Sequence, residues 1–403
     1  MISTPRGAPR LLTDRTFGPY FFGNLVSNCG TWFQNVAAAV VVFNLTGSAV
    51  LVGAVSVAQM LPSLLLSLPA GVLTDRVDRR KLLLSGQLLS ASASGCLAVW
   101  TGLVGVEGLP GIWPVLGASL VLGVGIAFSI PAMQALVPAL VPPEDLDLAI
   151  ALNSVTFNAA RAVGPALGAA TLVAFGPAAA FAVNAASFLV LVAMLLAVTP
   201  RAVERSTGGD RSVRASLSYV RADRTSLMLL VGVAALGFGA DPVYTLTPPL
   251  AEAFGGGDRL VGLLVSAFGS GAVLSALLVG RLRRRCGQRS LGLAGLVGLG
   301  GGMLGLVASP NQTAALVFLG VGGAGYLFAT TALTTLLQQR VPEDLRGRVM
   351  ALWTIALLGS RPVAALIDGA LADLTSVRVA IVFAAIVPLV SAAIVWRDAL
   401  RVL

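Results

Sequence analysis

Residues 121–140 read VLGVGIAFSIPAMQALVPAL, and residues 321–340 read VGGAGYLFATTALTTLLQQR. The two stretches align without a gap at an offset of 200 residues, and the match continues as far as Arg161 and Arg361. The residues that the first copy shares with the second are Val121, Gly123, Gly125, Phe128, Ala132, Leu136, Val141, Pro142, Ala151, Leu152 and Arg161. A same-order repeat at an offset of about half the chain length, within an apolar chain, predicts two structural halves of one design.

The composition around this repeat is typical of a membrane protein. Of the 403 residues, 56% are hydrophobic and 11% are charged, whereas soluble domains carry roughly 25% charged residues. A spanning helix needs about 20 mostly apolar residues, and the apolar runs here have about that length. They do not show the short alternating segments of an outer-membrane barrel, so the predicted class is an all-α integral membrane protein.

The sequence predicts twelve transmembrane helices in two pseudo-symmetric six-helix bundles. Their expected ranges are 17–45, 49–74, 82–106, 112–140, 147–175, 177–198, 225–251, 259–281, 290–308, 313–337, 347–372 and 377–396. The first bundle is expected over residues 1–198 and the second over residues 225–403. The polar residues 199–224 between them are typical of a cytoplasmic linker. Within the linker, Val213 to Tyr219 form either a short amphipathic helix on the lipid headgroups or a solvated coil.

The positive charges are distributed unequally between the two sides of the predicted membrane. All 27 Lys and Arg residues except four fall in segments that are cytoplasmic when the N-terminus is inside. Of these four, Arg161 and Arg361 lie within apolar segments, and Arg259 and Arg378 lie outside. The bias predicts a multi-pass protein of the cell inner (cytoplasmic) membrane with both termini in the cytoplasm. It also explains the net charge of +9 without nucleic-acid binding.

Several kinds of chemistry are excluded by missing residues. The chain has no histidine, which excludes a His proton relay, a His metal site and a Ser-His-Asp triad. The three cysteines show no metal-ligand spacing. No G-x-x-x-x-G-K-[ST] motif is present, which excludes a pump that hydrolyses ATP. We therefore expect neither an enzyme nor a bound metal or cofactor.

The loop between the second and third predicted helices carries the most specific motif. It reads GVLTDRVDRRK, residues 71–81, and combines a tight turn with a carboxylate and a cluster of cations. The carboxylate of Asp75 can accept charge-assisted hydrogen bonds or face the N-terminus of a neighbouring helix. The run resembles the loop signature G-x-x-x-D-R-x-G-R-[RK] of the major facilitator superfamily, with Asp78 in place of the usual glycine.

Other stretches resemble one branch of that superfamily, the enterobactin-exporter-like and macrolide-efflux-like carriers. They are NLVSNCGTWFQ (24–34), LTGSA (45–49), RAVGPALG (161–168) and VPEDLRGRVMAL (341–352). The resemblance implies a rocker-switch carrier in which helices 1, 4, 7 and 10 line a central cavity. It also implies that Gly71, Asp75 and Arg79 belong to a conformational latch that acts near the start of helix 11.

A second motif lies in the fifth predicted helix. Gly164, Pro165 and Gly168 resemble the superfamily's antiporter motif G-x-x-x-G-P-x-x-G-G, although Ala160 and Ala169 replace two of its glycines. Small residues with a proline make a thin, bent surface that suits sliding between the two halves. The resemblance implies antiport, whereas a kinked packing helix accounts for the same residues without it.

The third feature is charge inside apolar segments. A charged side chain at mid-bilayer costs roughly 2.5–3.5 kcal/mol and needs a partner or a wet cavity. Asp241 and Arg361 lie at similar depths in helices 7 and 11, which belong to the same half of the implied fold, so we expect them to pair. Arg161 lies at the same depth in helix 5. Its expected neighbours are the polar helix 1 residues Asn24, Asn28 and Asn35.

Two interpretations of the Asp241–Arg361 pair stay open. In the first, the pair is a static internal brace. In the second, Asp241 is the proton-coupling carboxylate and Arg361 competes with the proton for it. Burial favours the neutral form of a carboxyl group and a nearby guanidinium favours the ionised form, so alternation between the two environments loads and releases a proton. Asp368, two turns beyond Arg361, and Arg161 complete the set of coupling candidates.

Polar and aromatic side chains in the predicted spans are candidates for a substrate cavity. Aromatic groups among neutral hydrogen-bonding groups suit an amphipathic organic solute, whereas polar packing between helices accounts for about half of them. The candidates are Asn24, Asn28, Trp32, Gln34, Asn35, Gln134, Asn158 and Tyr326.

Together with the resemblance, these features predict a monomeric secondary active transporter. We expect the proton gradient to be its energy source and small amphipathic molecules, such as drugs, antibiotics or a siderophore, to be exported. The expected partners are this substrate, protons and membrane lipid. An importer or lysolipid flippase on the same fold is the first alternative, and a non-transporting membrane sensor or scaffold is the second.

Overall fold

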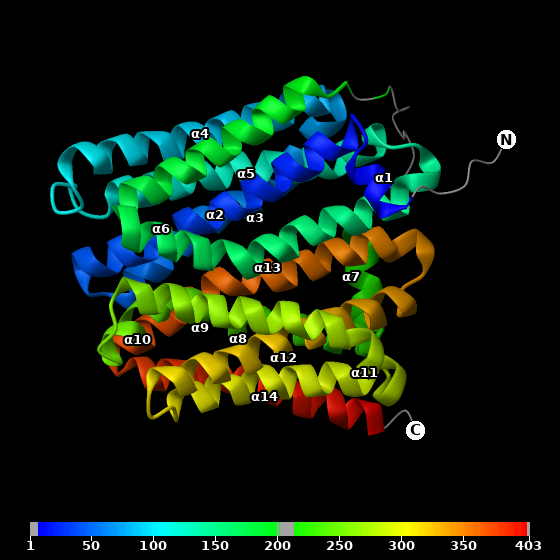
Figure 1. Cartoon of the computed structure of the whole chain (residues 1–403). Coiled ribbons are helices and arrows are strands. Elements are labelled where there is room, and N and C mark those ends of the chain that lie inside the picture. Colours follow the sequence, from blue (N-terminus) through cyan, green and yellow to red (C-terminus); the bar gives the residue numbers. More distant parts are fainter. Residues whose placement is uncertain (1–6, 200, 202–212, 401–403) are drawn as a thin grey trace. The chain divides into compact units, whose positions relative to one another are not determined.

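The computed structural model describes residues 7–199, 201 and 213–400, and every element within these ranges is helical. Ten of the helices there are long and apolar enough to cross a membrane, which confirms the predicted all-α membrane class (Figure 1). The long helices are α2 (Phe17–Thr46), α3 (Ala49–Arg76), α4 (Arg79–Val104), α5 (Trp113–Leu140), α6 (Leu146–Ala197), α8 (Arg224–Ala240), α11 (Asp258–Val307), α12 (Gln312–Arg340), α13 (Glu343–Leu374) and α14 (Val377–Leu400). The short ones are α1 (Ala8–Leu12), the 3₁₀ turn η1 (Pro143–Asp145), α7 (Val213–Ala222), α9 (Pro242–Thr245) and α10 (Thr247–Ala253).

Two of the long helices, α6 and α11, are interrupted by a glycine. They contain 52 and 50 residues, and a straight helix of that length would extend roughly 75 Å, far beyond a hydrocarbon core of about 30 Å. Gly176 has a φ of 80° and Gly287 a φ of 79°, a left-handed conformation that favours glycine. The chain folds back on itself in both helices (Figure 1). Both glycines lie where the sequence predicts one span to end and the next to begin.

The chain divides into two compact units. The first comprises residues 1–45 and 58–207, and the second comprises residues 46–57 and 208–403. The start of α3, as far as Val57, therefore belongs to the second unit, whereas the rest of α3 belongs to the first. This one helix passes from one unit into the other.

Glycines set the distances between helices within each unit. In the first unit, a Cβ on Gly86 of α4 would lie only 2.7 Å from the carbonyl oxygen of Gly125 in α5. In the second unit, a Cβ on Gly302 of α11 would lie 2.6 Å from the backbone nitrogen of Gly322 in α12. Side chains larger than hydrogen cannot occupy these positions without moving the helices apart. Such close approach supplies the van der Waals energy that holds helices together in lipid.

Many large apolar side chains point away from the helix contacts. Leu103, Phe175 and Leu277 are 80%, 77% and 76% exposed. A soluble monomer rarely exposes continuous apolar surface, but the same surface is favourable against lipid chains. The burial pattern therefore agrees with the membrane class predicted from composition.

Helix α7 lies within the predicted linker, in the part of the chain that belongs to the second unit. Residues 200 and 202–212 of that linker lie outside the described residues. Of the two alternatives for Val213 to Tyr219, a helix or a coil, the structure shows the helix, as part of α7. The Tyr219 hydroxyl donates a hydrogen bond to the carbonyl oxygen of Arg340 (3.2 Å). Asp223 caps α8 through the Ser226 N–H (3.2 Å) and accepts two hydrogen bonds from the Arg340 guanidinium (2.6 and 2.7 Å). These bonds fix the start of α8 against the end of α12.

The ion pair between Asp223 and Arg340 leads to a prediction for stability. The hydrogen bond from Arg340 holds the pKa of the Asp223 carboxyl well below its usual range. Because the folded-state pKa is lowered, the pair stabilises the fold above the unfolded pKa of about 3.9, and this contribution is lost as the pH falls below that value. Asp223→Ala should cost about 1 kcal/mol at neutral pH, since the pair is partly exposed. The measurement is thermal unfolding in detergent, compared at neutral pH and at low pH.

The matched control is Arg221→Ala, which removes an exposed cation of α7, one turn or less from Asp223. The unfolding temperature of this variant should match that of the parent protein at both pH values. A pH-independent loss in Asp223→Ala would contradict the assignment, because it would show that the charge of the carboxylate does not matter.

Candidate functional site

Asp241 lies where the seventh predicted span loses its regular helical hydrogen bonding. α8 ends at Ala240, and Pro242 provides no backbone N–H to continue the ladder. The backbone N–H of Asp241 donates to the carbonyl oxygen of Phe238 (3.1 Å), a tighter turn than in an α-helix. Broken helices inside a membrane protein are tolerated where they line a buried polar site. Asp241, the one acidic residue between the start of α8 and the end of α9, thus lies at the break between these two helices.

The carboxylate of Asp241 is only half satisfied. Its side chain is fully buried, and its Oδ2 accepts a hydrogen bond from the Thr245 hydroxyl (2.7 Å), one turn along the chain. Its Oδ1 has no hydrogen-bond partner among the described residues. An unpaired oxygen of a buried carboxylate is costly when the group is ionised, and protonation removes most of that cost.

α13 brings the other ionisable groups of the site next to α8. A Cβ on Gly237 would overlap the Ser360 hydroxyl and the carbonyl oxygen of Leu357, so glycine is required for the two helices to meet here. This contact lies one turn before Asp241 and directly before Arg361. It therefore brings the middle of α13 to the level of the broken segment of α8.

Arg361 contacts an aromatic ring. Its guanidinium carbon lies 4.4 Å from the centre of the Tyr244 ring, a cation–π contact worth about 2 kcal/mol when desolvated. Among the described residues, the Nε of Arg361 has no hydrogen-bond partner. No hydrogen bond between Arg361 and Asp241 is present among the described residues, but the guanidinium lies within electrostatic reach of that carboxylate. The expected pairing of the two residues, as a brace or as a coupling site, stays a prediction.

Asp368 is the second carboxylate of the site. It follows Arg361 by two turns of α13, is fully buried, and has no hydrogen-bond partner on either oxygen within the described part of the chain. It lies within electrostatic reach of Asp241. Asp241 thus lies within electrostatic reach of both the Arg361 guanidinium and the second buried carboxylate. The cluster carries a net negative charge when both are ionised and is neutral when they hold one proton between them.

Sequence reasoning found the charged residues of this cluster but missed the neutral ones. Tyr244 and Thr245 follow Asp241 by three and four residues, the spacing at which side chains on one helix face meet. The same spacing rule applied around Asp241 would have identified both. Trp353, two turns before Arg361 on α13, also has an indole N–H without a partner among the described residues. No pattern in the sequence singles it out.

The first unit contains polar networks at several of the proposed cavity residues. The Asn24 amide donates to the Asn153 side chain (2.8 Å) and the Thr156 hydroxyl (3.1 Å), and the Asn28 amide donates to Asn24 Oδ1 (2.9 Å). The Gln34 side-chain oxygen accepts hydrogen bonds from Ser94 (2.6 Å) and Asn184 (2.7 Å). Asn24 and Gln34 are almost fully buried, so they serve as hydrogen-bonded packing between helices in this conformation.

The remaining cavity candidates differ in exposure. Tyr326 is buried and its ring is tilted against that of Phe268, with 5.8 Å between the ring centres. Trp32 and Asn35 are half-buried, and Gln134 is exposed. The side chain of Asn158 lies outside the described residues. Arg161 is half-buried on α6, and its contact with the asparagines of α2 stays a prediction.

The glycines of the fifth predicted helix make a close contact with the first. A Cβ on Gly164 would lie 2.7 Å from the Trp32 ring, and one on Gly168 would lie 2.9 Å from the backbone Cα of Phe33. Pro165 is buried between them. Packing thus accounts for Gly164, Pro165 and Gly168, and the role in antiport stays a prediction.

This contact gives a second prediction. Gly168→Ala should destabilise the protein by about 1–3 kcal/mol, because the added methyl group meets backbone that cannot turn aside. Gly117→Ala is the matched control, since a Cβ there meets nothing within 4 Å. The measurement is thermal unfolding of both variants in one detergent. Equal unfolding temperatures for the two variants would contradict the close packing of α6 on α2.

The loop expected to form the latch is partly described. Gly71 lies inside α3 and is half-buried, and the side chain of Asp75 lies outside the described residues. Arg79 donates a hydrogen bond to the carbonyl oxygen of Ala135 in α5 (3.1 Å), and Asp78 caps α4 through the Lys81 N–H (3.0 Å). These bonds hold the loop within the first unit. The latch near helix 11 stays a prediction.

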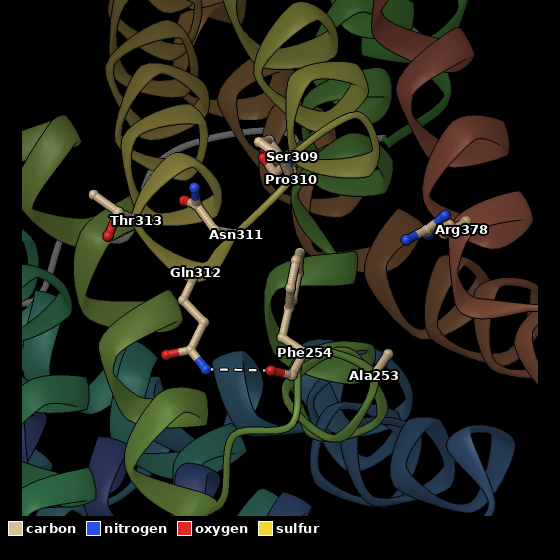
Figure 2. Close-up of a pocket in the computed structure, with 8 residues that line it drawn as sticks. All are labelled: Ala253, Phe254, Ser309, Pro310, Asn311, Gln312, Thr313 and Arg378. Carbon is tan, nitrogen blue, oxygen red and sulfur yellow. Dashed lines mark hydrogen bonds between the residues drawn. The ribbon is translucent and has the colours of Figure 1, made fainter.

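A polar pocket of about 600 Å³ lies at one end of the second unit (Figure 2). It is lined by the end of α10, the turn between α11 and α12, and Arg378 near the start of α14. Figure 2 shows the Gln312 amide donating to the carbonyl oxygen of Phe254 across the pocket (3.2 Å). Its lining contains no buried carboxylate, so it lacks the chemistry of the Asp241–Asp368 cluster.

Comparisons with known proteins agree with the fold and extend it to a family. The family model of transmembrane secretion effectors matches residues 8–403. The chain is 25% identical to macrolide efflux protein A of Streptococcus pyogenes, covering 81% of this chain and 82% of that protein. It is 30% identical to the enterobactin exporter EntS of Salmonella choleraesuis (strain SC-B67), covering 91% of this chain and 88% of that protein.

Solved structures with the same fold are far more distant in sequence. A bacterial homolog of the human lysosomal transporter Spinster, in its inward-facing and unoccupied conformation, matches with a TM-score of 0.76 at 14% identity over 94% of this chain and 95% of its own. The nucleoside transporter NupG matches with a TM-score of 0.70 at 11% identity over 94% of this chain and 98% of its own. These matches concern the fold alone.

Proposed function

The chain belongs to the transmembrane secretion effector family of the major facilitator superfamily, and from this membership we propose that it is a proton-coupled exporter of small amphipathic molecules. The family and the efflux proteins among its relatives identify a multi-pass membrane transporter and not an enzyme. The direction, the coupling ion and the substrate class are the proposal. Alternating access of a binding site to the two sides of the membrane is the proposed mode of transport.

The proposed topology has twelve crossings in two six-helix bundles. Counting α6 and α11 as two spans each, because Gly176 and Gly287 break them, brings the ten apolar helices to twelve crossings. An even number of crossings places both termini on one side, and the positive-inside bias assigns that side to the cytoplasm. The proposed location is the bacterial inner membrane, and the proposed working form is a monomer.

The observation that supports proton coupling is a pair of fully buried, incompletely hydrogen-bonded carboxylates, one of which lies within electrostatic reach of Arg361. Asp241 and Asp368 together with the guanidinium form a neutral group only when they hold one proton. A conformation that leaves the cluster dry retains this proton, and one that admits water releases it. A proton taken up on the acidic side then drives the return of the empty carrier. No bound cofactor is required, because the gradient is the energy source.

The relatives support the proposed substrate class. One is named for macrolides and the other for enterobactin, so drugs, antibiotics and siderophores are the first substrates to test. Neutral polar and aromatic side chains near the surface of the first unit, such as Trp32 and Asn35, suit amphipathic solutes.

Accumulation of a fluorescent dye and of a macrolide in cells that express the protein tests the proposal. Efflux predicts lower accumulation than in control cells and a return to the control level when a protonophore collapses the gradient. An importer predicts higher accumulation, and a sensor or scaffold predicts no change. A lysolipid flippase predicts movement of labelled lysolipid between leaflets with no effect on the other two probes.

A further inference from the structure

The start of α3 is held on α13 by a single carboxylate. Asp373, near the end of α13, accepts hydrogen bonds from the Ser48 hydroxyl (2.5 Å), the Ala49 N–H (2.7 Å) and the Val50 N–H (3.1 Å). An acid at this place satisfies N–H groups that a helix N-terminus leaves unpaired and complements the positive end of the helix dipole. Asp373 therefore caps the N-terminus of α3 from another helix of the second unit, beside the N-cap residue Ser48, whose hydroxyl accepts a hydrogen bond from the Leu51 N–H (3.4 Å).

Glycines continue this contact along both helices. A Cβ on Gly369 would lie 2.5 Å from the Cα of Val50, and a Cβ on Gly53 would overlap the carbonyl oxygen of Ala365. Ala365, Gly369 and Asp373 are four residues apart, so they form one face of α13. The start of α3 lies along that face for two turns.

The covered stretch of α13 contains one of the coupling carboxylates. Asp368 follows Ala365 by three residues and directly precedes Gly369, and it is fully buried with both oxygens unpaired among the described residues. The burial of Asp368 and the close packing of α3 occur at the same two turns of α13. Separating these helices would expose this part of α13 to water.

The path of α3 makes this contact sensitive to movement between the units. Residues 46–57 belong to the second unit, and the rest of α3 belongs to the first. If one unit moves relative to the other, α3 has to bend, or one of its two ends has to leave the unit that it packs in. Lifting the start breaks all three hydrogen bonds of Asp373 at once.

We propose that residues 48–57 form a gate over Asp368 and that Asp373 is its latch. In the proposed topology this end of α13 faces the outside, so the gate separates the coupling carboxylates from external water until α3 leaves α13. The inference rests on the proposed transport cycle. Asp373 itself is a positioning residue, because its role is to set how long the gate stays closed.

Thiol labelling tests the latch without requiring a known substrate. Cys29, Cys96 and Cys286 are free thiols and are first replaced by serine. Ala49→Cys then places a reporter at a position that is 1% exposed while α3 lies on α13. In intact cells, Asp373→Asn should raise the labelling rate by a membrane-impermeant maleimide about fivefold, the population change that corresponds to the loss of a typical helix N-cap. Asp258→Asn, at the start of α11 in the same unit, should leave the rate unchanged.

A disulfide that holds the gate closed provides an independent test, in which transport is measured. Oxidation of the double variant Ser48→Cys and Asp373→Cys should stop efflux, and dithiothreitol should restore it, whereas oxidation of Ser48→Cys alone should have no effect. An unchanged labelling rate in Asp373→Asn, or full transport by the oxidised double variant, overturns the latch. If the Asp373→Asn protein is not produced in the membrane, Ser48→Ala takes its place. This variant removes one of the three hydrogen bonds and should show a smaller increase in the labelling rate.

The latch and the coupling site fail in distinguishable ways. If Asp241→Asn leaves efflux intact while Asp373→Asn still raises labelling, the coupling assignment is wrong and the gate stands. If Asp241→Asn abolishes efflux while the labelling rate of Asp373→Asn equals that of Asp258→Asn, the coupling site stands and the gate is wrong.

Discussion

Asp241→Asn should abolish efflux driven by a proton gradient in everted membrane vesicles. Asparagine keeps the size of the side chain and can still accept the hydrogen bond from Thr245, so the fold of the second unit should be preserved. It cannot bind and release a proton, and Asp368 is then the only carboxylate left in the cluster. Transport of a macrolide or a dye against its gradient should fall to the level of vesicles without the protein. Binding of the same probe to the purified variant should be retained.

Glu252→Gln is the matched control for this variant. Glu252 is an exposed acid at the end of α10, in the same unit, and its removal changes the charge without touching the cluster. It should transport at the rate of the parent protein. Normal uphill transport by Asp241→Asn would remove Asp241 from the mechanism, and the static-brace interpretation of the cluster would then be the correct one.

Arg361→Gln should separate uphill transport from exchange. Without the guanidinium, release of the proton leaves an uncompensated charge in a buried site, which costs about 3 kcal/mol or more. Each kcal/mol slows the step severalfold, so proton release should become about a hundredfold slower. The carboxylates then stay protonated, so uphill efflux is lost. Exchange of labelled for unlabelled substrate, which needs no proton release, should continue.

Two further variants show whether the loss of uphill efflux in Arg361→Gln comes from the missing charge or from altered packing. Arg361→Lys keeps the charge beside the carboxylates and should retain part of the uphill rate. Arg378→Gln removes an exposed arginine of the second unit near the polar pocket and should have no effect. Loss of exchange together with uphill transport in Arg361→Gln would contradict this role of the guanidinium, because it would point to a general packing defect.

The fold was predictable because local sequence determines it. The length of each apolar run sets the length of a span, and glycines mark where one span ends and the next begins. The sequence predicts span borders at Gly176-Pro177 and in the segment around Gly287, and both of these glycines have a left-handed conformation. Asp241, Arg361 and Asp368 were identifiable because a charged side chain within an apolar run is costly and therefore rare unless it has a function. The spacing of seven residues, two helical turns, was sufficient to place Arg361 and Asp368 on the same face of one helix.

The direct contacts of the site were not predictable in the same way. Whether Arg361 meets Asp241 or Tyr244 depends on the rotation of α13 relative to α8, which the close contact at Gly237 sets. Periodicity within one helix carries no information on that rotation. Asp373 was missed for a related reason. It lies at the end of a span, where an acid normally indicates a solvated loop, and only the packing of α3 gives it a partner.

Proton coupling at this site requires that Asp241 and Asp368 hold one exchangeable proton between them. Infrared difference spectroscopy of the purified protein between acid and alkaline pH detects such a proton through the carbonyl stretch of a protonated carboxylic acid. We expect a band in the parent protein that disappears at alkaline pH and is absent from the double variant Asp241→Asn and Asp368→Asn. A parent spectrum without such a band, or one whose band persists unchanged in the double variant, would show that the two carboxylates do not carry the proton.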